Sequence, residues 1–266
     1  GQFFPDLREY VEFREPFLGG GSVAIHVSKL YPHLKIVVND LYEPLINFWV
    51  NLQTFGDELT KELKGLKITN CNQDSARCLF AEMKDVINDS TKTDLERAVA
   101  FYVVNKCSFS GLTESSSFSA QASDSNFSMR GIEKLPEYSE IISHWHINSY
   151  SYEYCFQNNI HDGLFMYLDP PYDIKDNLYG KKGAMHKGFN HDQFAEDCSK
   201  SSVHQLVSYN SDQLVKDRFK GWNAGEFNLT YTMRSVGEYM KEQQTRKELL
   251  LFNYEKTVAN LEVCTG

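Results

Sequence analysis

The sequence predicts an α/β fold with a mostly parallel sheet, and three observations support this prediction. The continuous apolar run at 164–168 has the pattern of a strand that is buried on both faces. Three glycines at 19–21 separate a short apolar stretch from a helix-like one, as in a tight turn between a strand and a helix. The next apolar run, 35–39, ends at an acidic residue. This order of strand, turn, helix and strand is typical of a doubly wound sheet.

The expected elements fall into three groups along the chain. Before residue 55 we expect strands at about 11–17 and 35–39 and helices at 23–30 and 43–53. From about 55 to 145 the pattern changes, and helical periodicity with apolar residues on one face appears at 74–89 and 94–106. After 145 we expect strands at 146–148, 164–168 and 203–208, closed by an antiparallel pair at 227–232 and 247–253.

The stretch at 108–130 is rich in serine and shows no pattern that would form a core. A segment of this length without secondary structure inside a compact domain is more often functional than idle. We therefore expect a hairpin or a mobile loop that reaches a partner, with disorder as the alternative.

The residues after the run at 164–168 suggest a ligand site. Asp169, Pro170, Pro171 and Tyr172 follow that predicted strand directly, and open α/β sheets bind ligands at the carboxyl ends of their strands. The prolines fix the backbone and contribute no N–H, so nearby carbonyl oxygens stay free to accept hydrogen bonds from a ligand. A carboxylate, a free carbonyl and an aromatic ring suit a planar molecule with an exocyclic amino group. A strand-ending turn with a core tyrosine is the alternative.

The glycines predict a second part of the same site. Gly19, Gly20 and Gly21 allow a ligand to approach the backbone ahead of a helix. Asp40 ends the next predicted strand about 20 residues later, where an acid reaches ribose hydroxyls in doubly wound folds. The glycines lack the Gly-x-Gly-x-x-Gly spacing of pyrophosphate sites, so a ligand with ribose and adenine but no phosphate fits better. S-adenosylmethionine is such a ligand.

The composition limits the class of protein. The chain has 266 residues, of which 41% are hydrophobic, enough for one large core or a core with a smaller lobe. No apolar run approaches the length of a membrane span and no signal peptide opens the sequence, so we expect a cytoplasmic protein that contacts no membrane. The six cysteines lack Cys-x-x-Cys spacing, and the eight histidines form no pattern with carboxylates, so we expect reduced thiols and no metal site.

The formal net charge of −9 argues against a polyanionic partner, but phosphate contact depends on local clusters of Lys and Arg. Two polar segments hold such clusters, one after the tetrapeptide at 169–172 and one between the last two predicted strands. Their members are Lys175, Lys181, Lys182, His186 and Lys187 in the first, and Arg234, Lys241, Arg246 and Lys247 in the second. Solvated surface loops are the alternative interpretation of both.

The motifs follow one another in a distinctive order. The glycine loop at 16–23 comes first, then the acid at 39–40, the segments 97–105, 111–112 and 126–127, the tetrapeptide at 169–172, and finally 245–250 with 253–254. In this order, and over nearly the whole chain, the sequence resembles the Dam-like (D12) class of adenine-specific DNA methyltransferases. It departs from that family in two places, since no Gly-Gly-Lys-like segment precedes Phe4-Pro5 and the acid usual before the catalytic strand is not evident at 148–152.

The resemblance implies a Rossmann-like S-adenosylmethionine-dependent methyltransferase sheet with a mostly helical target-recognition insert. The implied catalytic domain comprises 1–54 and 146–266, and the implied target-recognition domain comprises 55–145. The implied function is site-specific transfer of a methyl group from S-adenosylmethionine to N6 of an adenine that is flipped out of double-stranded DNA. We expect a monomer, with a dimer as the alternative, and a companion restriction endonuclease in a bacterial or infected host cell.

The resemblance also assigns roles to residues. The carboxylate of Asp169 and the carbonyl of Pro170 would accept hydrogen bonds from the adenine amino group, and Tyr172 would stack on the base. The implied catalytic residues are Asp169, Pro170, Pro171 and Tyr172, and the implied cofactor residues are Phe17, Gly19, Gly20, Gly21, Ser22, Asp40 and Asp169. The implied DNA contacts are Asn105, Ser110, Gly111, Asn126, Arg130, Lys181, Lys182, Lys187 and Arg246.

Other functions stay open from the sequence alone. A methyltransferase for cytosine N4, for RNA adenine or for a protein glutamine amide would present a similar planar amino group to the tetrapeptide. A degenerate relative that binds DNA or a partner without turnover is a second alternative, against which the intact motifs argue. A nicotinamide dehydrogenase fits least, because the glycine spacing differs and the tetrapeptide has no role in it.

Overall fold

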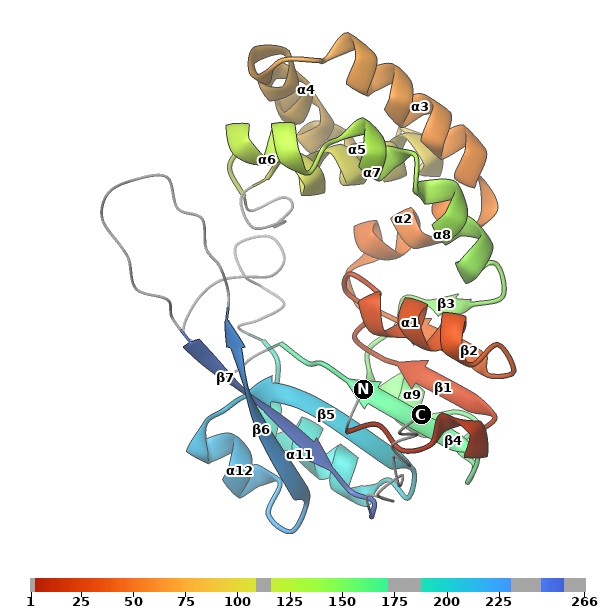
Figure 1. Cartoon of the computed structure of the whole chain (residues 1–266), viewed down its shortest axis with the longest axis vertical. Coiled ribbons are helices and arrows are strands. Elements are labelled where there is room, and N and C mark those ends of the chain that lie inside the picture. Colours follow the sequence, from red (N-terminus) through yellow and green to blue (C-terminus); the bar gives the residue numbers. More distant parts are fainter. Residues whose placement is uncertain (1–2, 109–115, 172–187, 231–244, 256–266) are drawn as a thin grey trace, which may run out of the picture.

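The computed structural model describes residues 3–108, 116–171, 188–230 and 245–255 of the chain. These residues form a seven-stranded sheet in the order β3-β2-β1-β4-β5-β7-β6 (Figure 1). The strands are β1 (Glu12–Glu15), β2 (Lys35–Asn39), β3 (His146–Asn148), β4 (Leu164–Leu168), β5 (His204–Asn210), β6 (Asn223–Thr230) and β7 (Thr245–Phe252). Strands β1 to β5 run parallel, and β7 is antiparallel to both of its neighbours. The sheet confirms the predicted α/β class.

Several strand boundaries differ from the prediction by one to four residues, and two of these differences have a clear cause. β1 ends at Glu15, two residues earlier than expected, because Pro16 has no N–H for the ladder and the chain turns there into the glycine loop. β6 begins at Asn223 instead of residue 227, since its pairing with β7 starts with Asn223 opposite Phe252. Both differences arise from hydrogen bonding between neighbouring strands, which cannot be predicted from the apolar residues of one strand alone.

Alternate residues of the central strands face two separate hydrophobic cores. β4 is buried along its whole length, with Phe165 and Tyr167 in one core and Leu164, Met166 and Leu168 in the other. The first core continues into η1 (Leu7–Glu9), α1 (Ser22–Leu30) and α2 (Glu43–Thr54), and the second into α11 (His191–Lys200) and α12 (Gln213–Arg218). A short helix, α9 (Glu153–Gln157), connects β3 to β4. Burial on both faces explains why β4 reads as an uninterrupted apolar run.

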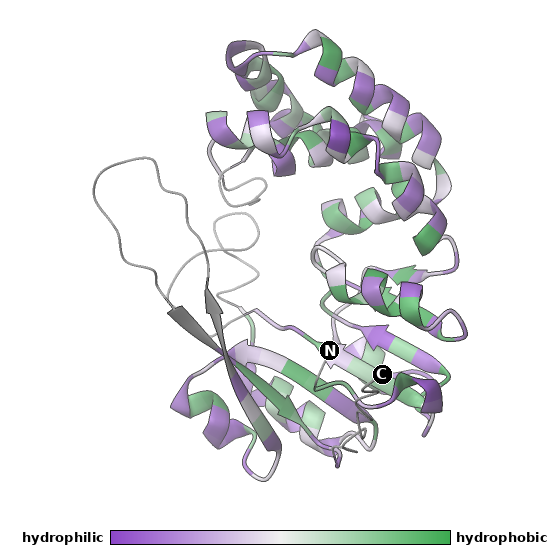
Figure 2. Cartoon of the chain, in the orientation of Figure 1, coloured by the Kyte–Doolittle hydropathy of each residue, from purple (hydrophilic) through white to green (hydrophobic). Residues whose placement is uncertain are grey.

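Among the described residues between 56 and 142, six helices, here called the helical lobe, lie away from most of the sheet, and the last of them packs against α1 and α2 (Figure 1). They are α3 (Gly56–Thr69), α4 (Gln73–Val86), α5 (Asp94–Cys107), α6 (Ala120–Ser125), α7 (Met129–Ile132) and α8 (Leu135–Ile142). α5 is buried from Ala98 to Val104, and α3, α4 and α6 pack against it. Hydrophilic and hydrophobic residues alternate along the helices around it (Figure 2), as expected of amphipathic helices. The prediction found α4 and α5 but missed α3 and α8.

The described part of the serine-rich stretch, 116–130, is more ordered than predicted, and the expectation of a hairpin or a mobile loop is wrong there, while residues 109–115 lie outside the described residues. The helix α6 and the first turn of α7 lie within it, and Phe127 is fully buried in the core. Composition misled the prediction because Ser119 and Ser128 are helix N-caps. Each accepts a hydrogen bond from the backbone N–H three residues later, which satisfies a donor at the start of its helix.

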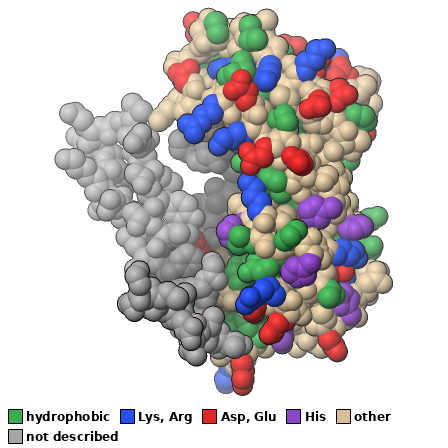
Figure 3. Space-filling view, turned by 45° about the vertical axis from the view of Figure 1, so that its right-hand side comes forward, with side chains coloured by type: hydrophobic (Ala, Val, Ile, Leu, Met, Phe, Trp, Pro, Cys, Tyr) green, Lys and Arg blue, Asp and Glu red, His purple; other side chains and the backbone are tan. Residues whose placement is uncertain are grey.

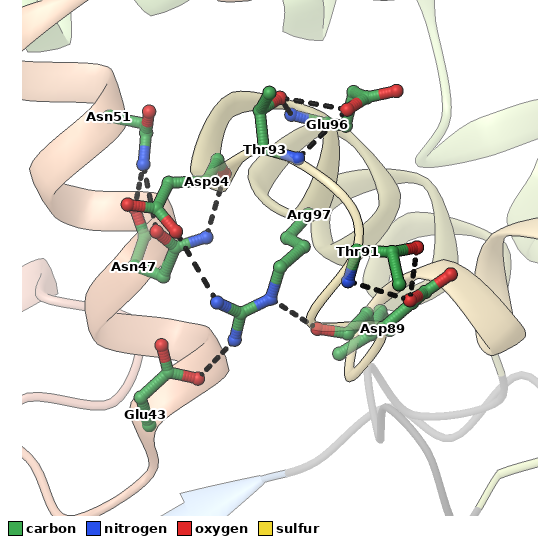
Figure 4. Close-up of polar contacts among 10 residues, drawn as sticks. Glu43, Asn47, Asn51, Asp89, Thr91, Thr93, Asp94, Glu96 and Arg97 are labelled. Atoms are coloured by element: carbon green, nitrogen blue, oxygen red, sulfur yellow. Dashed lines mark hydrogen bonds and ion pairs between the residues drawn. The ribbon is translucent and has the colours of Figure 1, made fainter.

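Arg97 joins the helical lobe to the helix that follows β2 (Figure 4). From α5 its guanidinium donates to the Glu43 carboxylate at 2.6 Å and to the carbonyl of Ile87 at 2.9 Å. Asp94 lies 3.4 Å from the same group, and its carbonyl accepts from the Asn47 side chain at 2.8 Å. These contacts fix α5 against the N-terminal half of α2.

Candidate active site at the carboxyl edge of the sheet

The glycine loop lies between β1 and α1, and two of its glycines need the conformation that glycine allows. Gly19 and Gly21 have φ of +48° and +65°, in the left-handed region that other residues avoid. A Cβ on Gly21 would lie 2.9 Å from the ring of Trp49, and the indole N–H of Trp49 donates to the carbonyl of Gly19 at 3.2 Å. A Cβ on Gly19 or Gly20 would meet nothing within 4 Å. The loop is thus held from the Trp49 side, with open space beside Gly19 and Gly20.

Asp40 holds the same loop from the end of β2. One carboxylate oxygen accepts from the backbone N–H of Gly19 at 3.0 Å, and the other accepts from that of Tyr42 at 3.0 Å. Burial raises the pKa of Asp40, and these N–H groups oppose the rise because they favour the ionised form. Each carboxylate oxygen keeps a further lone pair, so Asp40 can also accept from a ligand hydroxyl.

Asn39 connects three strands at this edge. Its side-chain N–H₂ donates to the carbonyls of Pro16 at 3.1 Å and Tyr150 at 2.9 Å, and its side-chain oxygen accepts from the Tyr150 N–H at 2.9 Å. The residue is 1% exposed. The sequence prediction gave Asn39 no function of its own, although its place beside Asp40 at a strand end was visible.

Glu15 is a buried carboxyl group that the prediction did not include. It ends β1, is 3% exposed, and accepts from the backbone N–H of Ala24 at 2.8 Å. Because Gly21 has no side chain to cap α1, Glu15 supplies the acceptor that a capping residue would provide. Burial raises its pKa well above the ordinary value, and the negative charges of Asp169 and Asp40 add to the rise. A Glu at a strand end directly before the glycine loop was the available signal.

Asp169 lies at the carboxyl end of β4, followed by the buried Pro170 and the half-buried Pro171. The protein around Asp169 removes much of its water, which raises the pKa of its carboxyl to about 7, and the Glu248 carboxylate contributes to the rise. The residue is exposed to solvent at its surface, and water that reaches the carboxylate opposes the burial effect. Tyr172, the fourth residue of the tetrapeptide, lies outside the described residues.

The four carboxyl groups therefore act on one another across the sheet edge. Glu15, Asp40 and Asp169 end the neighbouring strands β1, β2 and β4, and the buried Glu248 comes from β7, where it pairs opposite Asn210. Burial is the largest cause of the raised pKa values of the first three, and neighbouring negative charges contribute for Glu15 and Asp169. Such an edge favours a ligand that carries a positive charge.

Phe17 belongs to an aromatic cluster behind this edge. Its ring stacks on Tyr152 with centroids 5.6 Å apart and meets the edges of Phe189 at 5.8 Å and Phe194 at 5.7 Å. Phe17 is half-buried, so part of its ring remains accessible. Ser22, also predicted for the cofactor, is the first residue of α1 and is exposed.

The predicted DNA contacts are only partly visible. Asn105 is half-buried near the end of α5, while Asn126 and Arg130 are exposed at the ends of α6 and α7. Arg246 lies in β7, with its backbone opposite Leu229 of β6. Ser110, Gly111, Lys181, Lys182 and Lys187 lie outside the described residues, and the same holds for the other basic residues of the clusters at 175–187 and 234–241.

Two features are absent from the described residues. No group of three or more His, Cys, Asp or Glu side chains in these ranges is arranged to hold a metal ion. No helix in the same part of the chain has both the length and the apolar character that crossing a bilayer requires.

Comparisons with known proteins show the family of the chain. Residues 2–236 match the model of the D12 class N6 adenine-specific DNA methyltransferase family. The chain is 24% identical to the type II methyltransferase M1.LlaDCHI of Lactococcus lactis subsp. cremoris, over 92% of this chain and 87% of that protein. It is 22% identical to the type II methyltransferase M.MjaIII of Methanocaldococcus jannaschii, over 94% and 89%.

A third similarity is shorter. The chain is 30% identical to the DNA N-6-adenine-methyltransferase of Escherichia phage P1, over 42% of this chain and 14% of that protein. The family match spans most of the chain and includes the glycine loop, Asp40 and the tetrapeptide. The chain therefore belongs to the D12 class of N6 adenine-specific DNA methyltransferases, and it methylates adenine in DNA.

Proposed function

We propose that the methyl donor is S-adenosylmethionine and that it binds between the glycine loop and the carboxyl groups at the sheet edge. The observation that carries this proposal is the group of four carboxyl groups at that edge, where the charges of Asp169 and Asp40 act on Glu15 and the charge of Glu248 acts on Asp169. The sulfonium of S-adenosylmethionine is a cation that would offset this charge. The open space beside Gly19 and Gly20 supports a ligand packed against the loop backbone.

Asp40 would hold the ribose hydroxyls in this arrangement, since both of its oxygens keep an acceptor site beyond the loop N–H groups. Phe17 would offer its accessible ring surface to the cofactor, and Ser22 its hydroxyl near the start of α1. When bound, the cofactor supplies an electrophilic methyl group, and the protein contributes position and charge.

The acceptor adenine would bind at the tetrapeptide. Its amino group would donate one hydrogen bond to the Asp169 carboxylate and one to the carbonyl of Pro170, and Tyr172 would stack on the base. Both acceptors stabilise the positive charge that grows on the nitrogen during transfer, so they lower the barrier more than they aid binding. Since a duplex hides this amino group, the adenine would be flipped out of the helix.

The wider assignments follow from the same proposal. Residues 1–54 and 146–266 would form the catalytic domain, and 55–145, which include the helical lobe, would recognise the target sequence. Double-stranded DNA would be the partner, contacted by Asn105, Asn126, Arg130 and the other residues assigned from the resemblance. A companion restriction endonuclease, a monomeric state and action in the cytoplasm, where the DNA lies, complete the proposal.

Methyl transfer from radiolabelled S-adenosylmethionine to unmethylated duplex DNA tests the catalytic assignment. We expect label in 6-methyladenine, reduced on the order of 10²–10³-fold by Asp169→Asn, which keeps the shape of the side chain and removes its charge. Asp162→Asn, an exposed aspartate before β4, is the matched control and should keep wild-type activity. Equal rates for Asp169→Asn and the wild type would reject Asp169 as the acceptor.

A further inference from the structure

Four basic side chains of the helical lobe lie over aromatic rings. The distances from each charged group to its ring centroid are 5.0 Å for Lys67 over Phe127, 4.6 Å for Arg77 over Phe118, 5.5 Å for Lys84 over Phe80, and 5.6 Å for Lys106 over Tyr102. We refer to these four cations as the ring cations. They come from three successive helices, α3, α4 and α5.

Three of the ring cations, Arg77, Lys84 and Lys67, contact the segment 116–127 of the lobe. Ser108 and Phe118 pair there in an antiparallel bridge, which brings the end of α5 next to the start of the segment before α6. The rings of Phe80 and Phe118 meet at 5.6 Å, so Arg77 and Lys84 flank the same pair. The rings of Tyr102 and Phe127, which carry Lys106 and Lys67, have centroids 6.5 Å apart.

Backbone contacts hold two of these side chains in place. The Nζ of Lys84 donates to the carbonyl of Ser116 at 3.0 Å, and the Nζ of Lys67 donates to the carbonyl of Ser123 at 3.3 Å. A lysine ammonium has three N–H donors, so each keeps donors for another acceptor. The aromatic rings and backbone carbonyls thus hold the ammonium groups in place, and neither carries a negative charge that would neutralise them.

None of the ring cations forms an ion pair with a carboxylate of the described residues. Arg97 and Lys92 of the same lobe do, with Glu43 and Glu96, whereas Lys61, Lys64, Arg130 and Lys134 also have no carboxylate partner among the described residues. Burial lowers the pKa of Lys106, and no acidic neighbour opposes the effect. A partly desolvated cation without a counter-ion gains most when an anion approaches.

The overall charge of the lobe does not by itself attract DNA. Residues 55–145 hold ten Lys and Arg against fourteen Asp and Glu, so the segment has no excess of positive charge. On the face drawn in Figure 3, basic and acidic side chains alternate over the helical lobe, as on an ordinary solvated surface. Attraction of an anion to this lobe therefore depends on local cations that lack acidic partners.

We propose that the ring cations bind phosphates of the DNA backbone and so place the duplex against the bridge at 108 and 118. The inference rests on the proposed function, because these phosphates belong to the duplex whose adenine is methylated. Phosphate contacts of this kind fix register and orientation and carry no sequence information themselves. They would complement the base contacts predicted for Asn105, Asn126 and Arg130.

The test is the salt dependence of binding to an unmethylated duplex of random sequence, measured by fluorescence anisotropy. Each phosphate contact that is lost lowers the slope of log K against log salt by about 0.9. The variant with Lys67→Gln, Arg77→Gln, Lys84→Gln and Lys106→Gln should therefore lose about 3–4 from the slope. Lys92→Gln, an exposed and ion-paired lysine of the same lobe, is the matched control and should leave the slope unchanged.

A second variant separates charge from packing. With Lys67→Arg, Lys84→Arg and Lys106→Arg the positive charges remain, so the slope should stay near that of the wild type even if the ring contacts change. S-adenosylmethionine affinity and the far-ultraviolet circular dichroism of every variant should match the wild type. An unchanged slope in a folded quadruple Gln variant would overturn the inference. Failure of the wild type to methylate any duplex would instead overturn the proposed function.

Discussion

Carboxyl groups dominate the proposed site at the scale of single residues. Glu15, Asp40 and Asp169 each hold a proton to higher pH than a free carboxyl group does, and burial is the largest cause for all three. The bonds that Asp40 accepts from Gly19 and Tyr42 keep that carboxylate in place. A cationic cofactor would favour the ionised forms and so draw protons off the site.

Cofactor binding should therefore release protons near neutral pH. The pKa of Asp169 is raised to about 7, so part of the unliganded protein carries a proton there at pH 7, and a bound sulfonium lowers that pKa. Calorimetric titration with S-adenosylmethionine in buffers of different ionisation enthalpy measures the release. Asp169→Asn should release fewer protons than the wild type, and identical values for the two proteins would contradict the charge argument.

Gly20 and Gly21 of the glycine loop should differ in how much an alanine substitution destabilises the protein. Gly21→Ala places a Cβ at a φ of +65° and 2.9 Å from Trp49, so we expect a loss of about 1–3 kcal/mol in the free energy of unfolding. Gly20→Ala is the matched control, because Gly20 has an ordinary φ and open space, and it should change stability by less than about 0.5 kcal/mol. Urea denaturation of both variants checks the contrast, and equal losses would disprove it.

At the scale of elements, Arg97 links two helices that have different surroundings. α2 follows the strand that ends beside Asp40, while α5 forms the centre of the helical lobe. The bonds from Arg97 to Glu43 and to the carbonyl of Ile87 close this junction, and its side chain is 17% exposed. Loss of these bonds should therefore lower the stability of the whole molecule.

Arg97→Ala should lower the free energy of unfolding by about 1.5–3 kcal/mol, because a buried carbonyl and a carboxylate lose a charged donor. Lys92→Ala removes only an exposed ion pair with Glu96 at 3.7 Å and should cost less than about 0.5 kcal/mol. Thermal and urea unfolding of the two variants compare the effects. A cost for Arg97→Ala no larger than that for Lys92→Ala would show that the junction is not stabilising.

At the scale of the whole molecule, the buried carboxyl group of Glu15 makes the free energy of unfolding depend on pH. The folded-state pKa of Glu15 lies above its unfolded value of about 4.3, so the stability it contributes is fully present below that value. That contribution is lost as the pH rises through the folded-state pKa. Ionisation of Glu15 should therefore lower the unfolding free energy of the protein over this pH window.

Glu15→Gln removes this dependence and keeps an oxygen that can accept from the Ala24 N–H. The unfolding free energy of the variant minus that of the wild type should rise as the pH increases above about 4.3. Urea denaturation at several pH values between 4 and 9 measures the difference. A difference that stays constant or falls with pH would show that Glu15 is not buried in its ionisable form.

Much of the fold was predictable because the local pattern of apolar residues matches the burial of each element in the folded protein. The run at 164–168 is apolar since both faces of β4 are covered, and Asp169 follows it at the edge where parallel strands place ligands. The serine-rich stretch was not predictable from composition, because its serines cap helices and only packing reveals that Phe127 lies in the core.

The sequence by itself determined the order of the motifs, and with it the α/β class, the glycine loop, Asp40 and the tetrapeptide. The tertiary structure decided which groups act together. Glu15, Asn39 and Glu248 joined the site only when strands far apart in the chain came side by side. The physical reason is that pKa shifts, capping bonds and ring contacts depend on distance in space, and a linear pattern reports only the separation along the chain.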